Sequence, residues 1–405
     1  MITIFGGVYT ERCLVPPWHQ IYGSGGRAAA ALSKLSDNVR LCTYLAAKDM
    51  IAFKSVAAVY RFHFEVVEVD TGIAFDYFHG LSVPHIAPAP SKIVQQPPII
   101  GEAECALRFG FMEGDAIVKG GRVVYDPQSA SSPQPYRDNG SEADVLAYVL
   151  NKHEGSLFCG SRNPTEICKY LHKEHQADVV VLKMGPRGAL ISDGGKLMLV
   201  PCLETDNVWP LGSGDVFAAI FSHYWAEKNE SAEIAAMQAS KATAYYCNTS
   251  TLPIPFDIDK FIDSDCIPES YVSREGEAPL QVYLAGPFFN VAERWLIEEV
   301  RNELQRSGLK VFSPLHDVGP GKADDVAVKD LKGVDDSQLM FAILNGLDPG
   351  TVYEIGYARA KGIPVIVLSQ NEKEEDLKMI EGSGCFVEND LVKAIYKTMW
   401  VANKL

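Results

Sequence analysis

The chain has 405 residues, 47% of them hydrophobic, and a formal net charge of −15. This length and apolar content predict two packed domains, and the negative charge argues against broad contact with nucleic-acid phosphates. The sequence contains no apolar stretch near the roughly 18 residues of a membrane span, and its nine cysteines include no C-x-x-C pair. We therefore expect a soluble, cytoplasmic protein that binds neither nucleic acid nor membranes.

Residues 1–255 alternate short β-rich runs with amphipathic segments. This alternation predicts an α/β domain with a largely parallel sheet and helices on both faces. Residues 62–80 are rich in aromatic and β-branched types with no helix between them, so we expect antiparallel strands that form a small β lid. The expected strands are MITIFGG, VRLCTYLAA, DAIVKGGRVVYDP, GSLFCG and ADVVVLKMG, and the expected helices include GGRAAAALSKLS, SEADVLAYVLNKH and NPTEICKYLHKEH.

Residues 256–279 are rich in acidic residues and proline and predict a linker. After them the alternation restarts. Residues 280–405 contain the expected strands LQVYLAG, KVFSP, QLMFAILN and IPVIVLS, separated by helical segments. This pattern predicts a smaller, doubly wound domain of the Rossmann or flavodoxin type.

A glycine-rich turn, Gly212-Ser213-Gly214-Asp215, precedes an amphipathic segment in the first domain. Glycines at the start of a helix let backbone amides converge on one point, which suits a phosphoryl group. An aspartate at this place can accept the proton of an attacking hydroxyl. The alternative is a simple N-cap and turn without catalytic function.

This turn resembles the G-x-G-D signature of the PfkB/ribokinase family of sugar and nucleoside kinases. GSGGRAAAALSKL, NPTE and VVLKMGPRGALI resemble further elements of the family in the same order, over roughly residues 1–255. The resemblance implies a ribokinase-like fold and a kinase that uses ATP and Mg²⁺. Arg27 stands where the family often has Asn, and the early sugar-binding Asp is not evident.

The resemblance also implies roles for single residues. Asp215 would be the catalytic base, and Gly212, Ser213 and Gly214 would hold phosphate. Glu166 would act on metal-bound water. The other residues implied to lie near phosphate or nucleotide are Asn163, which begins the N-x-x-E element, and Gly185.

In the second domain, Glu354 lies near the start of a predicted helix. Thr351 and Glu354 have the spacing of a capping box, and Gly362 would end the helix as a C-cap, which requires no catalysis. However, loops after the strands of a doubly wound sheet converge on one crevice. We expect Glu354 to meet Asp348 there, together with Asp330 at the start of the preceding helix. Closely spaced carboxylates are what glycosidic-bond chemistry uses.

YLAGPFF, SPLHDVGPG and KDLKGVDDSQLMFAILNGLDPGTVYEIGYA together resemble the nucleoside 2-deoxyribosyltransferases, over about residues 281–370. The resemblance implies that Glu354 is the nucleophile of a covalent glycosyl-enzyme. Asp348 and Asp330 would contact the base and assist its departure, Tyr283 would orient the nucleophile, and no cofactor is needed. Further residues expected to line the pocket are Gly286, Phe288, His316 and Asp317.

We therefore expect a homo-oligomer whose partner is a small nucleoside, nucleotide or sugar. The second domain would transfer a (deoxy)ribosyl group between bases, and the first would phosphorylate a sugar or nucleoside. Two alternatives stay open. The second domain could hydrolyse a nucleoside monophosphate, and the first could bind a nucleotide or sugar as a sensor without turnover.

Overall fold

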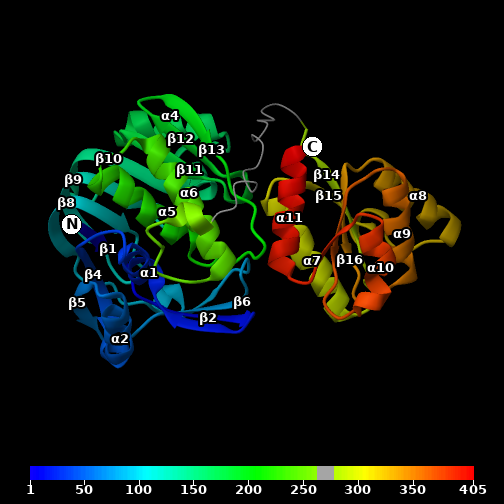
Figure 1. Ribbon diagram of the computed structural model, residues 1–405, viewed down its shortest axis with the longest axis horizontal. Helices are drawn as coiled ribbons and strands as arrows, with labels where there is room; N and C mark the ends of the chain where they lie inside the picture. The colour runs from blue at the N-terminus through cyan, green and yellow to red at the C-terminus, as the bar shows by residue number, and fades with distance from the viewer. Residues whose placement is uncertain (262–277) are drawn as a thin grey trace. The chain divides into compact units, whose positions relative to one another are not determined.

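The computed structural model describes residues 1–261 and 278–405. The chain divides into two compact units, Met1–Pro268 and Glu269–Leu405, each built around its own large sheet (Figure 1). The predicted linker, residues 256–279, lies mostly outside the described residues, and the predicted domain limits stay a prediction. Within the described ranges, no helix combines the length and apolar character needed to cross a membrane.

The first unit contains a nine-stranded sheet in the order β13-β12-β11-β10-β9-β8-β1-β4-β5. All neighbours from β11 to β5 pair in parallel, whereas β12 and β13 pair antiparallel. The strands are β1 Ile2–Phe5, β4 Val39–Ala46, β5 His63–Val69, β8 Ile99–Phe109, β9 Ala116–Asp126, β10 Glu142–Asn151, β11 Val179–Lys183, β12 Ala189–Asp193 and β13 Lys196–Val200.

Helices cover both faces of this sheet, as the sequence predicts. One apolar core joins α1, α5 and α6 to the sheet, and a second core contains buried residues of α4. The helices are α1 Gly23–Leu32, α2 Met50–Tyr60, α3 Lys152–Cys159, α4 Pro164–His175, α5 Ser213–Ser222 and α6 Ala232–Thr249. A separate four-stranded sheet contains β2 Thr10–Val15, β3 Trp18–Ile21, β6 Ala74–His79 and β7 His85–Ala87.

The antiparallel pairing predicted within residues 62–80 is wrong. β5 joins the nine-stranded sheet parallel to β4, and β6 joins the four-stranded sheet parallel to β2. Alternating side chains predict that a segment forms a strand. They do not determine which strand pairs with it, because the pairing strand comes from a distant segment of the chain.

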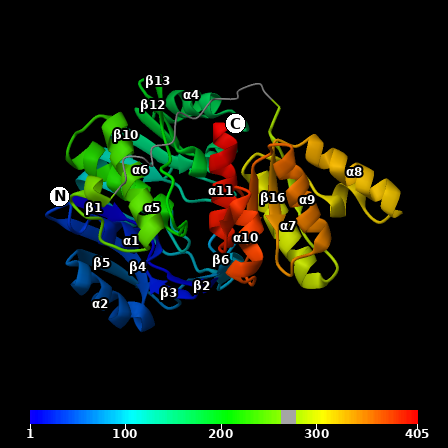
Figure 2. The same ribbon diagram turned by 45° about the vertical axis from the view of Figure 1, so that its right-hand side comes forward.

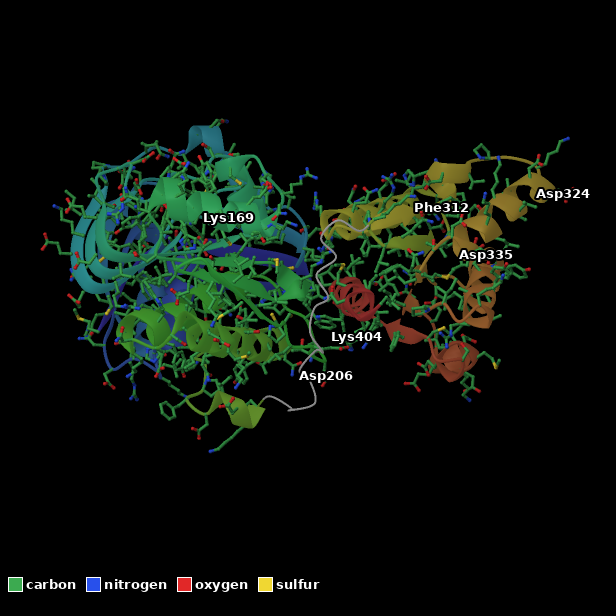
Figure 3. The ribbon with its side chains drawn as sticks, turned by 90° about the horizontal axis from the view of Figure 1, so that it is seen from above. Lys169, Asp206, Phe312, Asp324, Asp335 and Lys404 are labelled. Atoms are coloured by element: carbon green, nitrogen blue, oxygen red, sulfur yellow. The ribbon has the colours of Figure 1, made fainter. Side chains whose placement is uncertain are left out.

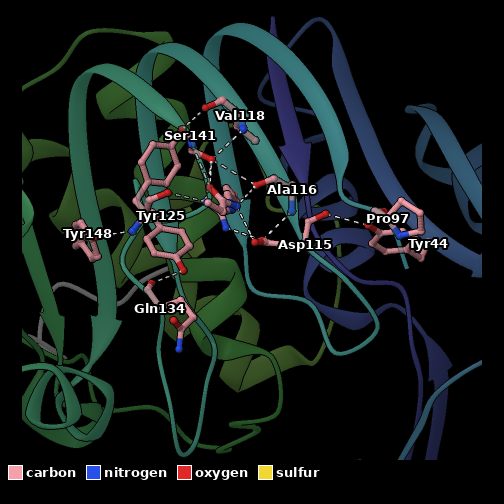
Figure 4. Close-up of polar contacts among 12 residues, drawn as sticks. Tyr44, Pro97, Asp115, Ala116, Val118, Tyr125, Gln134, Ser141 and Tyr148 are labelled. Atoms are coloured by element: carbon pink, nitrogen blue, oxygen red, sulfur yellow. Dashed lines mark hydrogen bonds and ion pairs between the residues drawn. The ribbon is translucent and has the colours of Figure 1, made fainter. Parts of the chain in front are cut away.

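Strands β8 and β9 are consecutive and parallel, yet only residues 110–115 connect them. Parallel neighbours ordinarily need a crossover of a dozen or more residues. Here β8 bends back over itself. Phe5 pairs with Arg108 near the end of β8, but a Cβ atom on Gly101, near its start, would lie 2.5 Å from the Phe5 ring. Figure 4 shows the strands of this region as arches. In each arch the first half of the strand, called its first arm, folds over the second half and covers the sheet where a helix would otherwise pack.

Residues 141–160 also differ from the prediction, because the expected helix 141–153 is strand β10 and the expected strand 155–160 lies in α3. The run Leu146–Leu150 is completely buried. A continuous apolar run fits a buried parallel strand as well as a helix, so periodicity could not separate the two. Asn151 and Glu154 form the capping box that begins α3, and Gly160 ends it in the left-handed conformation.

The second unit is a five-stranded parallel sheet in the order β15-β14-β16-β17-β18. In order along the unit this is 2-1-3-4-5, which confirms the predicted doubly wound fold and places its switch point between β14 and β16. Helix α9 packs beside β16 (Figure 2). The elements are β14 Gln281–Ala285, α7 Val291–Arg306, β15 Lys310–Phe312, α8 Ala323–Asp335, β16 Leu339–Ile343, α9 Pro349–Ala360, β17 Val365–Leu368, α10 Glu374–Gly382, β18 Phe386–Glu388 and α11 Leu391–Lys404.

Candidate functional site

A tyrosine and a glutamate meet at the switch point of the second unit. Tyr283 on β14 is completely buried and stacks on Phe312, with 5.6 Å between ring centroids. Its hydroxyl donates a 2.6 Å hydrogen bond to Glu354 Oε1, on α9. Burial raises the pKa of Glu354 to about 7, the bond from Tyr283 opposes this shift, and the charges of Asp330 and Asp348 add to it. The structure thus brings together the four residues that the sequence singles out.

The start of α9 differs from the predicted capping box. Its N-cap is Asp348, whose Oδ2 accepts hydrogen bonds from the backbone N–H of Thr351 at 2.8 Å and from its hydroxyl at 2.9 Å. Pro349 occupies the first helical position, where proline is favoured because no hydrogen bond is lost. The helix therefore begins at Pro349, two residues before Thr351, and its N-cap is Asp348 rather than Thr351, so Glu354 is not part of a capping box. Gly362, with φ of 75°, follows the last turn, as expected of a C-cap glycine.

Asp330 lies in the middle of α8 rather than at its start, and Figure 3 shows Asp324 and Asp335 nearer the helix ends. Its Oδ1 atom is buried and has no hydrogen-bond partner among the described residues. Burial raises the pKa of Asp330, because a buried carboxylate oxygen without a donor disfavours the charged form. A raised pKa favours the protonated form that a general acid requires.

The other predicted pocket residues have mainly structural contacts. A Cβ atom on Gly286 would lie 3.0 Å from Cβ of Ile343, so glycine lets β14 leave the sheet close to β16. Phe288 stacks on the exposed ring of Phe289. His316 Nε2 lies 2.7 Å from Glu298, and Asp317 accepts a 2.8 Å bond from the Ser313 N–H. Contact of Gly286, Phe288, His316 and Asp317 with a substrate stays a prediction.

In the first unit, Asp215 lies in the first turn of α5, after the N-cap Gly212. Both oxygens of Asp215 are engaged: Oδ2 lies 2.8 Å from Arg27 Nη1, and Oδ1 accepts a 2.6 Å bond from the Gln128 amide. The completely buried Arg27 also pairs with Glu11 at 2.6 Å. Asp215 would have to leave an ion pair before it could accept a proton, which opposes its predicted role as base.

Arg27 lies directly against the glycine-rich turn. A Cβ atom on Gly212 would be 2.1 Å from Arg27 Nε, so only glycine fits at this left-handed position, where φ is 77°. Ser213 is the first residue of α5, and a Cβ atom on Gly214 would lie 3.4 Å from Nζ of Lys183. The turn therefore faces a guanidinium on one side and an ammonium on the other.

The predicted N-x-x-E element serves as a helix cap. Asn163 Oδ1 accepts from the N–H groups of Thr165 and Glu166 at the start of α4, and the exposed Glu166 accepts a hydrogen bond from the Ser161 hydroxyl. The same spacing recurs at Asn151 and Glu154, directly at the carboxyl end of β10. Sequence reasoning missed this pair because it assigned residues 141–153 to a helix.

At that edge Lys183 Nζ lies 2.5 Å from Asp126 Oδ2. Burial raises the pKa of Asp126 to about 7, and the charge of Lys183 opposes the shift. Glu154 is buried nearby, and burial raises its pKa as well.

Across the described ranges, no three His, Cys, Asp or Glu side chains are grouped to hold a metal. The action of Glu166 on metal-bound water stays a prediction. The predicted Gly185 begins the turn from β11 to β12, with φ of 59°.

Replacing Arg27 with methionine should cost the first unit about 3–5 kcal/mol of unfolding free energy, because Glu11 and Asp215 would keep buried, uncompensated charge. The control Arg12→Met breaks the exposed pair with Asp76 and should cost about 1 kcal/mol or less. Urea titration followed by hydrogen exchange in this unit measures both. Equal, small losses of unfolding free energy in the two variants would contradict the view that Arg27 compensates the buried charges of Glu11 and Asp215.

Glu354→Gln should stabilise the second unit at pH 8 and much less at pH 5. Because the pKa of Glu354 is raised to about 7 in the folded chain, the folded state binds its proton more tightly than the unfolded state. The wild type therefore loses stability as the pH rises from about 4.5 to 7, by about 1–3 kcal/mol, and the variant does not. Glu375→Gln on the exposed surface of α10 is the control. Destabilisation of Glu354→Gln at both pH values would contradict this account.

Family models match parts of both units. Residues 116–252 match the pfkB family carbohydrate kinase model, and residues 282–391 match the nucleoside 2-deoxyribosyltransferase model. A search of curated proteins gave no match.

Solved structures similar to the chain include ribokinase-family kinases. Thermotoga maritima ribokinase is 16% identical, with a TM-score of 0.47, 64% of this chain and 98% of that chain covered. Vibrio cholerae fructokinase bound to fructose, ADP and calcium is 14% identical (TM-score 0.48; 65% and 99% covered). A pyrophosphate-dependent kinase complexed with a pyrophosphate analogue and myo-inositol is also 14% identical (TM-score 0.45; 65% and 100% covered). From the two family matches, the chain combines a pfkB family carbohydrate kinase domain with a nucleoside 2-deoxyribosyltransferase family domain.

Proposed function

We propose that the second unit cleaves the N-glycosidic bond of a nucleoside through Glu354 and passes the sugar to another base or to water. The observation that carries this proposal is the 2.6 Å hydrogen bond from Tyr283 to Glu354 Oε1 at the switch point of the sheet. A completely buried tyrosine with a stacked ring has little freedom to move, so it holds the carboxylate in one orientation. Oε2 is then the oxygen that attacks.

The reaction is a double displacement. Glu354 Oε2 forms a bond to the anomeric carbon while the bond to the base nitrogen breaks, and the base leaves with a proton from a carboxylic acid. A second base or water then attacks the same carbon, its proton passes to the carboxylate left by the acid, and the bond to Glu354 breaks. The enzyme is a transferase if a second base accepts the sugar and a hydrolase if water accepts it. Both reactions use the same nucleophile.

Asp330 is the best-suited proton donor. It is the acid with a buried oxygen that lacks a hydrogen-bond partner among the described residues, and burial raises its pKa. Asp348 is held in place by its bonds to Thr351, and its negative charge contributes to the raised pKa of Glu354. We assign to Asp348 the contact with the base, as the family resemblance implies.

The activity is tested by incubating the protein with a panel of nucleosides and nucleoside monophosphates, with and without a second free base, and identifying products by mass. An exchanged base indicates a transferase, and a free sugar indicates a hydrolase. Cleavage restricted to monophosphates would favour the hydrolase alternative. Absence of cleavage in every arm would overturn the proposal.

The acidic limb of the pH–rate profile should rise through a pKa of about 7, because Glu354 attacks only in its ionised form, and the rate should fall again where Asp330 loses its proton. Glu354→Gln should lower kcat at least about 1,000-fold. Tyr283→Phe removes a bond that lowers the pKa of Glu354, so its pH–rate profile should move to higher pH. Tyr353→Phe removes an exposed hydroxyl from the same helix and is the matched control. An unchanged profile in Tyr283→Phe would contradict the assigned role.

For the first unit, we propose that it binds a small phosphate-containing or sugar ligand without transferring a phosphoryl group. The observation that favours this over kinase activity is the engagement of both Asp215 oxygens by Arg27 and Gln128. Incubation with ATP, Mg²⁺ and a panel of sugars and nucleosides should give no product that has gained a phosphate. A phosphorylated product would restore the kinase function that the sequence predicts.

A further inference from the structure

Two neighbouring loops of the second unit are tied together by one carboxylate. β16 and β17 are parallel neighbours, and their last residues are register partners. The segments that follow, residues 344–348 and 369–373, therefore leave the same edge of the sheet side by side. The first segment carries Asp348, the N-cap of α9, and the second carries Glu372.

Glu372 accepts hydrogen bonds from both loops. Its Oε1 accepts a 2.6 Å bond from the N–H of Gly346. Its Oε2 accepts from the Ser369 hydroxyl at 2.8 Å and from the Asn371 N–H at 3.3 Å. Partial burial raises the pKa of Glu372, but these bonds outweigh burial, so the pKa lies below the ordinary value of a glutamate. The carboxylate therefore stays ionised over the range in which Glu354 titrates, and its bonds are charge-assisted.

The backbone that precedes Asp348 has a conformation that needs support. Gly346 and Leu347 have φ of 85° and 52°, and non-glycine residues such as Leu347 rarely adopt this left-handed conformation. A second link joins the same two loops, because Asn345 and Gln370 exchange hydrogen bonds of 3.0 and 3.1 Å. Asp348 directly follows Leu347, so the course of this backbone sets where the Asp348 carboxylate lies.

The position of Asp348 affects the electrostatics of the nucleophile. Burial raises the pKa of Glu354 to about 7, and the groups that face it are the Tyr283 hydroxyl from β14, Asp330 from α8 and Asp348 from the start of α9. The charge of Asp348 adds to the raised pKa, and the interaction between two charges weakens as their distance grows. If Asp348 moved away, the pKa of Glu354 would fall.

We propose that Glu372 is a positioning residue for glycosidic cleavage, because it fixes the loop that places Asp348 beside Glu354 and against the base of the substrate. The inference rests on the function proposed for the second unit, in which Asp348 contacts the base. Glu372 acts through its hydrogen bond from the Gly346 N–H rather than through its own charge. A neutral acceptor of the same shape can therefore replace it.

The pH dependence of cleavage by the full chain tests this role. Glu372→Ala should lower kcat/KM about 10- to 100-fold, because a small misplacement of a group near the reacting atoms causes a loss of this size. The acidic limb of its pH–rate profile should move to lower pH by about half a unit or more, because Asp348 raises the pKa of Glu354 less strongly from a greater distance. A loss of stability alone would not move this limb. A limb at unchanged pH would overturn the proposal.

Further variants separate position from charge. Glu372→Gln removes the same charge but keeps an oxygen that can accept from Gly346, so the acidic limb should return to its wild-type position. Equal shifts in the glutamine and alanine variants would show that the charge of Glu372 acts directly on Glu354, and would overturn the proposal. Asn345→Ala removes the second link between the loops and should move the limb in the same direction. Glu375→Ala removes an exposed acid from α10 and should leave the limb unchanged.

Titration of Glu354 by NMR separates this inference from the proposed function. The full chain labelled with ¹³C-glutamate reports the pKa of Glu354 without any substrate, and the signal is identified by its loss in Glu354→Gln. Absence of cleavage by the wild type would overturn the proposed function alone. A lower pKa of Glu354 in Glu372→Ala would still support the placement of Asp348 by Glu372, and an unchanged pKa would overturn it.

Discussion

Both units bury acidic side chains at the edge of a parallel sheet where the strands end. This burial is the constraint on which both units depend. A desolvated carboxylate is costly unless a donor or an opposite charge accompanies it. The second unit gives Glu354 a neutral donor, the Tyr283 hydroxyl, and the pKa of Glu354 settles near 7. The first unit gives Asp215 a charged partner, Arg27. A neutral donor leaves a carboxylate able to attack, whereas a buried guanidinium holds it as one half of an ion pair.

The glycine-rich turn of the first unit shows the consequence of this difference. Its backbone has the form that suits a phosphoryl group, with Gly212 in the left-handed conformation before α5. Yet Arg27 fills the space against that glycine and links it to Glu11 on the four-stranded sheet. The turn therefore has the backbone shape of a phosphate-binding turn, while the aspartate beside it belongs to a charge network with Arg27 and Glu11. This engagement of Asp215 is the observation behind the binding role proposed for the first unit.

The arched strands of the first unit depend on another buried arginine. Arg108 donates to Asp115 at 2.6 Å, to Ser141 Oγ at 3.2 Å and to the carbonyl oxygen of Tyr136 at 3.1 Å. Ser141 Oγ in turn accepts a bond from the Val118 N–H (Figure 4). These bonds connect the two arms of neighbouring arches, where helices would otherwise cover the sheet. A guanidinium is tolerated there because its charge and most of its donors are satisfied.

Features that depend on neighbouring residues could be predicted from the sequence alone. Alternating strand and helix patterns predicted two α/β domains, the second of them doubly wound. The turn before Glu354, with Tyr283 at a strand end, predicted the residues that meet. The sequence did not predict that residues 142–151 are a strand, that Asn151 and Glu154 directly follow the carboxyl end of this strand, or that Arg27 pairs with Asp215. Each of these depends on a partner distant in the chain. Local spacing is the same for a buried strand and a buried helix segment, and it cannot show which charge a fold places beside an aspartate.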